Sequence, residues 1–383
     1  MTQIYAPSAF RVSMSFNSGP TSNTGLVWTD LTEWFESIQV SRGRSSELDD
    51  YQAGSCQVVF DNRDRRFDPE HPAAYFNLGP RRQIKIECVV GAFTFPVFRG
   101  FVTALRQSWS GDDRQTCTVD AIDLFSAMAQ RRADDQPGNV SVTDRIFQVV
   151  AEADVVGLYA LGASSTIVGP VEAGSALAIA QAAAASEQGR LFVSAAGFVT
   201  YEPPTVDMDA APVAAFTDDG AAAGIRYGGL SFELSDRWII NSCTVTGSNG
   251  STGTYIDGLS NVANGPAARS ITTQLQTDAQ CRALAQTVVE RYKWPKTRPS
   301  GWVCTPTHDL ELLDVVNTEL GKVVSLRRLP KVGAAYTALL QIASISVDVN
   351  RSGATFSFSG APVDTTPRFR WGVSLWGGVD GWR

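Results

Sequence analysis

The chain has 383 residues, enough for two or three domains with a large buried core. Its 32 basic and 39 acidic residues give a net charge of −7. This balance argues against a dedicated nucleic-acid-binding protein, because that class carries a strong basic excess. The mild acidity has two interpretations, which are plain solubility or an acidic lumen along which DNA slides without sticking.

The six cysteines form no C-x-x-C pair and stand at no metal-ligand spacing from the two histidines. The sequence therefore predicts neither a zinc site nor a redox motif, and we expect reduced, structural thiols and no cofactor. The N-terminus lacks a secretion signal, and no apolar stretch approaches the roughly 18 to 20 residues that span a bilayer. We expect a protein assembled in a cytoplasm, with no membrane-spanning segment.

Residues 8–125 contain many short segments in which apolar and polar side chains alternate. In one of them Cys56, Val58 and Phe60 recur with a period of two, which places one apolar row on one face of a sheet. Many short strands at even spacing are typical of an antiparallel barrel or sandwich. Together with a short helix at LFSAMAQ, this pattern predicts an N-terminal β-barrel domain at 1–130.

The period becomes helical between residues 141 and 200. SVTDRIFQVVAEAD carries an apolar face behind a Ser or Thr cap, and an Ala-rich helix ends at Gly189. RLFVSAAGFVTYEP then reads as a hairpin that turns at Gly197. We predict an inserted α+β module of two helices and a hairpin within 131–235. Its first helix should bury Val142, Ile146, Val149 and Val150.

Strands resume after residue 235, and we predict a second β-barrel domain at 236–366. Residues 249–266 read as a long polar loop. Residues 277–294 read as one amphipathic helix stopped by Pro295. Its expected apolar stripe is Ala279, Ala283, Leu284, Thr287 and Val288.

The end of the chain repeats the order of its beginning. Three glycines that we place in turns between strands of similar length recur at one offset of 242 residues, which predicts two copies of one supersecondary unit. The fold class is therefore mainly β, with two similar antiparallel barrels flanking an α+β insertion. The glycine pairs are Gly79 and Gly321, Gly91 and Gly333, and Gly111 and Gly353.

The segment RGRSSELDDYQAGSCQVVFDNRDRRFDP, residues 42–69, consists of a strand between two charged loops. Its last nine residues combine Asx side chains, which favour turns, with a proline that cannot continue a ladder. The segment resembles the N-terminal barrel of tail proteins of long-tailed phages, in particular minor tail proteins of phages of actinobacteria. The matching residues are Arg42, Gly43, Arg44, Glu47, Leu48, Asp49, Gly54, Asn62, Arg63, Asp64, Arg66, Phe67, Asp68 and Pro69. The inserted module is similar to that of tail hubs at Gly189, Leu191, Phe192, Val193, Gly197, Val199 and Tyr201.

This resemblance implies a structural virion protein, the central hub (baseplate hub-like) of a siphovirus tail tip, with tail-tube-like barrels. It implies a homotrimer whose paired barrels make a pseudo-six-fold ring, with genomic DNA only passing through the lumen. The implied partners are a distal tail protein, a tape measure protein and other minor tail or fibre proteins. The alternatives are a distal tail protein that forms a hexameric ring or, from a different class, a tail-associated cell-wall hydrolase or glycan-binding module.

Few residues suggest chemistry, and we expect no enzyme. His71 and His308 lie near carboxylates in proline-containing segments, without a serine elbow or a paired cysteine. The Asp61, Asp64 and Asp68 set misses the calcium-loop spacing, so turn capping explains it better. Arginine doublets and a Trp/Gly-rich tail at 367–383 are left as candidate interface features, either for a neighbouring subunit or for the chain's own surface. The candidate interface residues are Arg65, Arg66, Arg81, Arg82, Trp371, Trp376 and Trp382.

Overall fold

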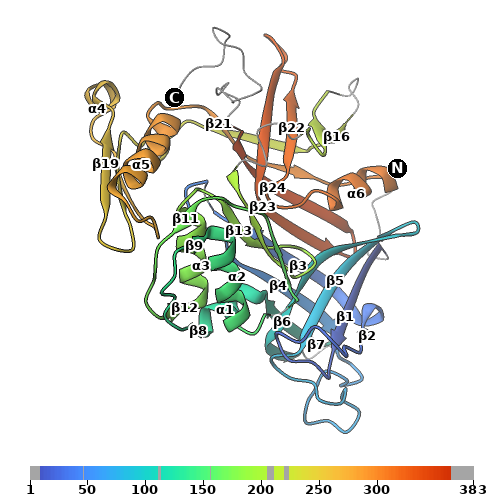
Figure 1. Cartoon of the computed structure of the whole chain (residues 1–383). Helices are drawn as coiled ribbons and strands as arrows, with labels where there is room; N and C mark the ends of the chain where they lie inside the picture. Colours follow the sequence, from blue (N-terminus) through green and yellow to red (C-terminus); the bar gives the residue numbers. More distant parts are fainter. Residues whose placement is uncertain are drawn as a thin grey trace.

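The computed structural model describes residues 9–45, 47–110, 114–155, 157–204, 211–219 and 224–363. The fold is mainly β, as the alternating patterns predicted, and most strands belong to one 14-stranded sheet. Figure 1 shows this sheet with the helices of residues 124–185 grouped on one side and a separate small module beside it. No helix in the described ranges is long and apolar enough to cross a membrane.

The first β unit contains seven strands, ordered β3-β4-β7-β6-β5-β1-β2 in the sheet. The predicted period of two is confirmed in β4, where Cys56, Val58 and Phe60 are buried and their neighbours are not. The long strand β6 pairs with β5 along its first half and with β7 along its second half. The strands are β1 Phe10–Ser15, β2 Thr29–Asp30, β3 Phe35–Gly43, β4 Gln52–Asp61, β5 Gln83–Val90, β6 Phe93–Trp109 and β7 Gln115–Ile122.

A helical module follows the first unit, and its helices pack on each other and on β4 and β13. The predicted apolar face of α2 is confirmed, because all four residues named above are fully buried. The predicted hairpin is β13 and β14, and it turns at Gly197 with φ +84°. The elements are α1 Leu124–Gln130, β8 Arg132–Ala133, β9 Val140–Ser141, α2 Val142–Glu152, β10 Tyr159–Leu161, β11 Ile167–Val168, β12 Gly174–Ser175, α3 Ala176–Ala185, β13 Arg190–Val193 and β14 Val199–Glu202.

The second β unit begins earlier than predicted. Strands β15, β16 and β17 lie before residue 235, yet β15 pairs with β22 and β17 pairs with β21, so they belong to this unit and not to the insertion. The strands are β15 Ala215–Thr217, β16 Ile225–Arg226, β17 Gly229–Glu233, β21 Arg298–Cys304, β22 Val323–Arg328, β23 Tyr336–Asn350 and β24 Gly353–Pro362, with helix α6 Asp309–Val316 after β21.

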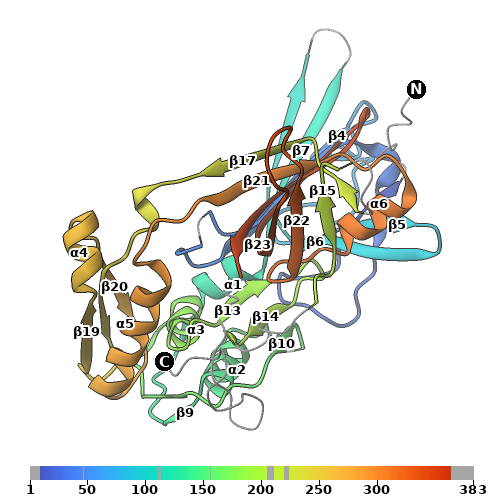
Figure 2. The same cartoon turned by 90° about the horizontal axis from the view of Figure 1, so that it is seen from above.

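A small module with its own hydrophobic core is inserted between β17 and β21. Figures 1 and 2 both show it at one end of the molecule, and Figure 2 shows β17 and β21 leading to it side by side. The predicted polar loop at 249–266 was wrong, since it contains a strand and a helix. The elements are β18 Ser242–Thr246, β19 Thr252–Ile256, α4 Gly258–Asn264, β20 Ala268–Thr272 and α5 Asp278–Tyr292.

Helix α5 forms where it was predicted, with a capping box between Thr277 and Gln280. The predicted apolar stripe was partly wrong, because Ala279, Ala283 and Thr287 are exposed. The prediction placed the small residues Ala279 and Ala283 on the apolar stripe, but the face that packs on the small module's core is rotated away from them. The buried face is Cys281, Leu284, Ala285, Val288, Val289 and Tyr292.

The two β units share one register, but the offset is 240 residues and not the predicted 242. Gln83 pairs with Phe101 in the first unit, and Val323 pairs with Gln341 in the second, each 240 positions later. A bulge follows in both, between Val102 and Ala104 and between Ile342 and Ser344. The strand pairings therefore define the repeat.

The offset predicted from the glycines was wrong by two residues because turns vary in length, whereas the register of paired strands is fixed. The left-handed residue before β22 is Gly321, with φ +77°, and its counterpart is Arg81, with φ +66°, not Gly79. Both donate their backbone N–H to the strand opposite, to the carbonyl oxygens of Ile342 and Val102 respectively. Gly111 lies outside the described residues.

The strands of each unit form an open, curved sheet, and in the described ranges no pair of strands closes either unit into a barrel. The units are instead joined to each other, because β23 of the second unit pairs antiparallel with β3 of the first over Ile38–Gly43. This pairing makes one continuous sheet out of two repeats.

Candidate assembly interface

The joint between the two units is built by the Arg-Gly-Arg turn at the end of β3. Gly43 has φ +117°, and a Cβ there would lie 2.3 Å from the backbone oxygen of Ala343. Only glycine allows β3 to approach the bulge of β23 so closely. The buried Arg42 guanidinium donates to Glu319 Oε1 at 2.8 Å, and Glu319 Oε2 accepts from the backbone N–H of Ala195 at 2.8 Å. One carboxylate therefore connects both β units with the helical module.

The next residues of the motif hold the small module in place. The Glu47 side chain is only 5% exposed, and it accepts from Arg291 at 2.8 Å, from the Tyr292 hydroxyl at 2.7 Å and from Arg298. Burial and the Glu47 charge raise the pKa of the Tyr292 hydroxyl. Leu48 packs against the core of the small module. The ELD part of the motif is thus a clamp that links β3 to α5 and β21.

The second charged loop of the motif closes over one end of β4. Asn62 is buried, and its Oδ1 accepts from the backbone N–H of Phe67 at 2.9 Å. The Phe67 ring stacks on Phe60 with centroids 4.5 Å apart. Asp68 accepts from Arg65 at 2.5 Å and from the Gln107 amide at 3.3 Å. The carboxylates here cap turns, as the sequence predicted.

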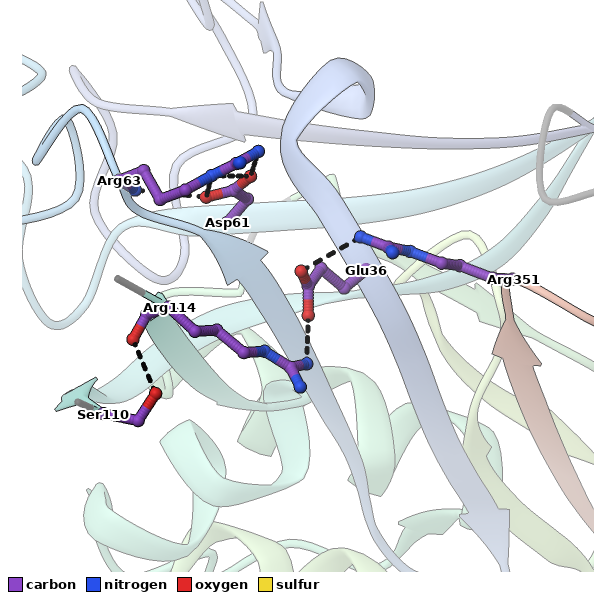
Figure 3. Close-up of polar contacts among 6 residues, drawn as sticks. All are labelled: Glu36, Asp61, Arg63, Ser110, Arg114 and Arg351. Atoms are coloured by element: carbon purple, nitrogen blue, oxygen red, sulfur yellow. Dashed lines mark hydrogen bonds and ion pairs between the residues drawn. The ribbon is translucent and has the colours of Figure 1, made fainter. Parts of the chain in front are cut away.

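The end of the joint carries one bridging carboxylate, shown in Figure 3. Glu36, at the start of β3, accepts from Arg114 at 2.8 Å and from Arg351 at 3.1 Å. Arg114 belongs to the turn between β6 and β7, and Arg351 to the turn between β23 and β24. Both arginines are mostly exposed, so the bridge contributes little stability but links corresponding turns of the two units.

A continuous face crosses the joint. Strands β6, β7, β4, β3, β23, β24, β21 and β17 are paired in this order, and every pairing is antiparallel. One face packs on the core, and the other presents hydroxyl and amide side chains with a few charges. Two pairs on this face bond across strands, Ser344 with Ser359 and Gln57 with Asp120. The residues are Gln39, Ser41, Ser55, Gln57, Thr116, Thr118, Asp120, Ser344, Ser346, Asp348, Thr355, Ser357 and Ser359.

The two edges of this eight-stranded sheet are unpaired in the described part of the chain. Strand β17 pairs only with β21. The second half of β6, residues 103–109, pairs with β7 on one side and with no strand on the other. Trp109 on β6 and Leu234 just after β17 are 59% and 65% exposed. Exposed strand edges with apolar side chains are templates for adding another strand.

Three of the predicted interface arginines, Arg65, Arg66 and Arg82, make contacts within the chain. Arg65 pairs with Asp68, and Arg66 pairs with Asp64 and lies over the Trp34 ring, 4.5 Å from its centroid. Arg82 donates to the backbone oxygens of Asn77 and Ser18, and Arg81 supplies the left-handed turn before β5. These contacts are local, so any role toward another subunit remains a prediction. Trp371, Trp376 and Trp382 lie outside the described residues.

The histidines occupy structural positions. His71 Nδ1 accepts from the backbone N–H of Ala73 at 3.2 Å, and His308 caps α6 by accepting from Glu311 N at 3.3 Å. Within the described ranges no group of three His, Cys, Asp or Glu residues is arranged to hold a metal ion. The six thiols are all buried and free, and burial raises the pKa of Cys88, Cys117 and Cys304 to about 12.

Solved structures with the same fold come from phage tails and a related secretion system. The 43 kDa tail protein of prophage MuSo2 from Shewanella oneidensis has a TM-score of 0.57 at 11% identity, covering 93% of this chain and 97% of that one. The tail protein from Neisseria meningitidis has a TM-score of 0.59 at 11% identity, covering 92% and 95%.

An Escherichia coli component of the type VI secretion system, itself structurally similar to the T4 phage tail proteins gp27 and gp5, has a TM-score of 0.50 at 9% identity. It covers 87% of this chain and 77% of that one. No protein-family model matches the chain, and no curated protein matches its sequence. At these identities the similarity shows the fold, which is shared along most of the chain.

Sequence reasoning found the motif but missed the free edges. Both edge strands are visible in the sequence as alternating patterns. In one, the apolar residues are Leu230, Phe232 and Leu234, and in the other a period of two runs through Leu105, Gln107 and Trp109. Both look like ordinary half-buried strands. Only the sheet order shows that no strand in the described ranges covers them.

Proposed function

We propose that this chain is a non-enzymatic structural protein of a phage tail, the central hub at the tail tip. Three copies form a ring of six similar β units that joins the tail tube or distal tail ring to the tip proteins. The duplicated β unit is the observation that carries this proposal. Each chain contains two units that share one register and are joined side by side. Three chains would therefore supply six similar units, which match a six-fold tube.

The continuous hydroxyl-bearing face is suited to line the channel. The Ser, Thr and Gln side chains of this face are uncharged, and its scattered carboxylates, Asp120 and Asp348, repel phosphate. The single arginine we place on this face, Arg106, is paired with Asp120 at 2.5 Å. Such a lining would let genomic DNA pass without sticking, as the acidic composition suggested.

Two alternatives remain distinguishable. A distal tail ring gets its six-fold order from six copies and does not need two units per chain. A cell-wall hydrolase needs a catalytic set, and the two histidines cap a turn and a helix instead. The same fold in two tail proteins adds support for a tail role.

The test is the copy number of the chain in its assembled ring, measured by native mass spectrometry of the purified protein. Three copies support the hub, and six copies support the distal tail ring. A zymogram on host cell walls tests the enzymatic alternative, because a cleared band that persists after purification would contradict the structural role.

A further inference from the structure

The joint inside the chain shows how one unit docks on the next. At this joint β3 lies antiparallel to β23, with Ile38 opposite Val349 and Val40 opposite Val347. All four side chains are at most 3% exposed. Because the two units are repeats, each residue of this joint has a counterpart on one of the two outer edges, β17 and the second half of β6.

The correspondence follows the ladders strand by strand. On one side, the offset of 240 places Trp109 of β6 where Val349 lies in β23. On the other side, Ile38 of β3 lies opposite Val58 of β4. In the second unit, Leu230 of β17 lies opposite Trp302 of β21. Val58 and Trp302 match because their partners, Val119 and Phe358, occupy the same place in β7 and β24. Strand β17 is therefore the counterpart of β3.

We propose that β17 of one copy adds antiparallel to residues 105–109 of β6 in a second copy, reproducing the internal joint between chains. The transferred register places Leu230 opposite Trp109, Ser231 opposite Ser108, Phe232 opposite Gln107, Glu233 opposite Arg106, and Leu234 opposite Leu105. This inference rests on the proposed ring, and it names the two edges and the register that close it.

The exposure of the residues at the outer edges fits the missing neighbour. Val347 and Val349 are buried by the internal joint, whereas their counterparts Gln107 and Trp109 are partly or mostly exposed. Leu234 is 65% exposed, whereas its counterpart Arg42 is 7% exposed. Covering such apolar side chains removes them from water, which favours the contact.

The side chains brought together by the register are complementary. Three apolar positions of β17 meet the core-side row of β6, and Glu233 meets Arg106 on the other face. Opposite charges directly across an antiparallel pair attract each other and favour this register. A slip of one residue would place Glu233 in the apolar row and lose both matches. The register follows from the pairing of β3 with β23 alone, without regard to which side chains it brings together. The match of these side chains is therefore independent support for it.

The geometry of the sheet also allows closure. The eight strands alternate in direction from β6 to β17, so β17 runs opposite to β6 and can extend the antiparallel order into the next copy. The contact joins two different edges, so it is heterologous, and such contacts give rings when the rotation closes. Three copies would close the row of eight strands into a ring in which β17 and the second half of β6 are both paired.

Cysteine cross-linking tests the register. Ser108→Cys and Ser231→Cys are combined in one chain, since both side chains are exposed and the six native thiols are buried. Directly opposite residues lie about 4.5–5.5 Å apart between Cα atoms, within disulfide reach. Mild oxidation should give a covalent ring of linked chains on a non-reducing gel, and each single variant should give background only.

The matched control is Ser108→Cys with Glu233→Cys, a diagonal pair on the same face about 7–8 Å apart, too far for an unstrained disulfide. A link in this control but not in the test pair would place β17 two residues out of register and overturn the proposal. Native mass is measured on the same samples. Three copies without a link would overturn the edge pairing while leaving the hub intact, whereas six linked copies would keep the pairing and reject the hub.

Discussion

The inner joint and the outer edges of the sheet are two versions of one arrangement, one covered and one open. At the inner joint, Gly43 allows close approach and Arg42 is buried against Glu319. At the outer edges, the corresponding strands carry exposed Trp109 and Leu234 instead. The inner joint is part of the fold of each chain, and in the assembly that we propose the outer edges are covered when copies pair. Mutations at the two places should therefore separate stability from assembly.

The largest effect is expected at Gly43. Gly43→Val forces a Cβ to within 2.3 Å of the Ala343 backbone oxygen at a positive φ, so the joint between β3 and β23 must open. We expect a loss of about 3 kcal/mol or more in the free energy of unfolding, measured by denaturant titration. Gly229→Val, on the outer edge strand where a Cβ meets nothing within 4 Å, is the control and should leave the stability of the monomer within about 0.5 kcal/mol. Equal losses in both would contradict the distinction.

Glu47 should have the next largest effect, because its removal leaves two arginines at the clamp without their carboxylate. Breaking a buried ion pair by removing one partner costs about 3–5 kcal/mol. Glu47→Gln keeps the shape and is expected to lower stability by about 3 kcal/mol, with the small module losing hydrogen-exchange protection first. Glu233→Gln removes an exposed pair and should cost no more than about 1 kcal/mol in the monomer.

Asp123 gives a pH dependence. It is buried at the N-terminus of α1, accepts from Gly54 N at 2.6 Å and Phe125 N at 2.9 Å, and its burial raises the pKa to about 7. A carboxyl that binds its proton more tightly when folded stabilises the protein in acid, and this contribution is lost as pH rises from about 4 through about 7. Asp123→Asn should remove that slope, by at most about 1.4 kcal/mol per pH unit. An unchanged slope in denaturant titrations across this range would contradict the assignment.

The smallest effect is expected from the charged pair at the outer edges. Arg106→Glu places a carboxylate opposite Glu233 of the next copy, and we expect assembly to weaken about fivefold per interface, since such pairs are worth up to about 1 kcal/mol. Adding Glu233→Arg restores the opposite charges across the contact. Sedimentation of the single and double variants measures this, and a double variant weaker than either single variant would show that the two residues do not face each other.

The sequence predicted the β class, the helix-helix-hairpin module and the helix at 277–294, because strand and helix periodicities survive in the final fold. It placed the repeat correctly in outline and shifted its register by two, since glycines mark turns and turns vary in length. The residues before 235 were assigned to the insertion because short strands such as β15 carry too few residues to show which sheet they join.

The candidate site was harder to predict. The motif around Glu47 was visible, but its partners Arg291 and Arg298 are more than 240 residues away, and no local pattern connects them. The free edges required the strand order of the whole sheet. Arg65, Arg66, Arg81 and Arg82 were predicted as interface residues because they form doublets, but the sequence could not show the contacts within the chain that Arg65, Arg66 and Arg82 make.

The most direct test is a cryo-EM map of the assembled ring at a resolution that separates strands. The account predicts three copies, with β17 of each copy beside β6 of the next and Leu230 opposite Trp109. A ring of six copies, or a three-copy ring in which these two edges face solvent or other chains, would contradict it.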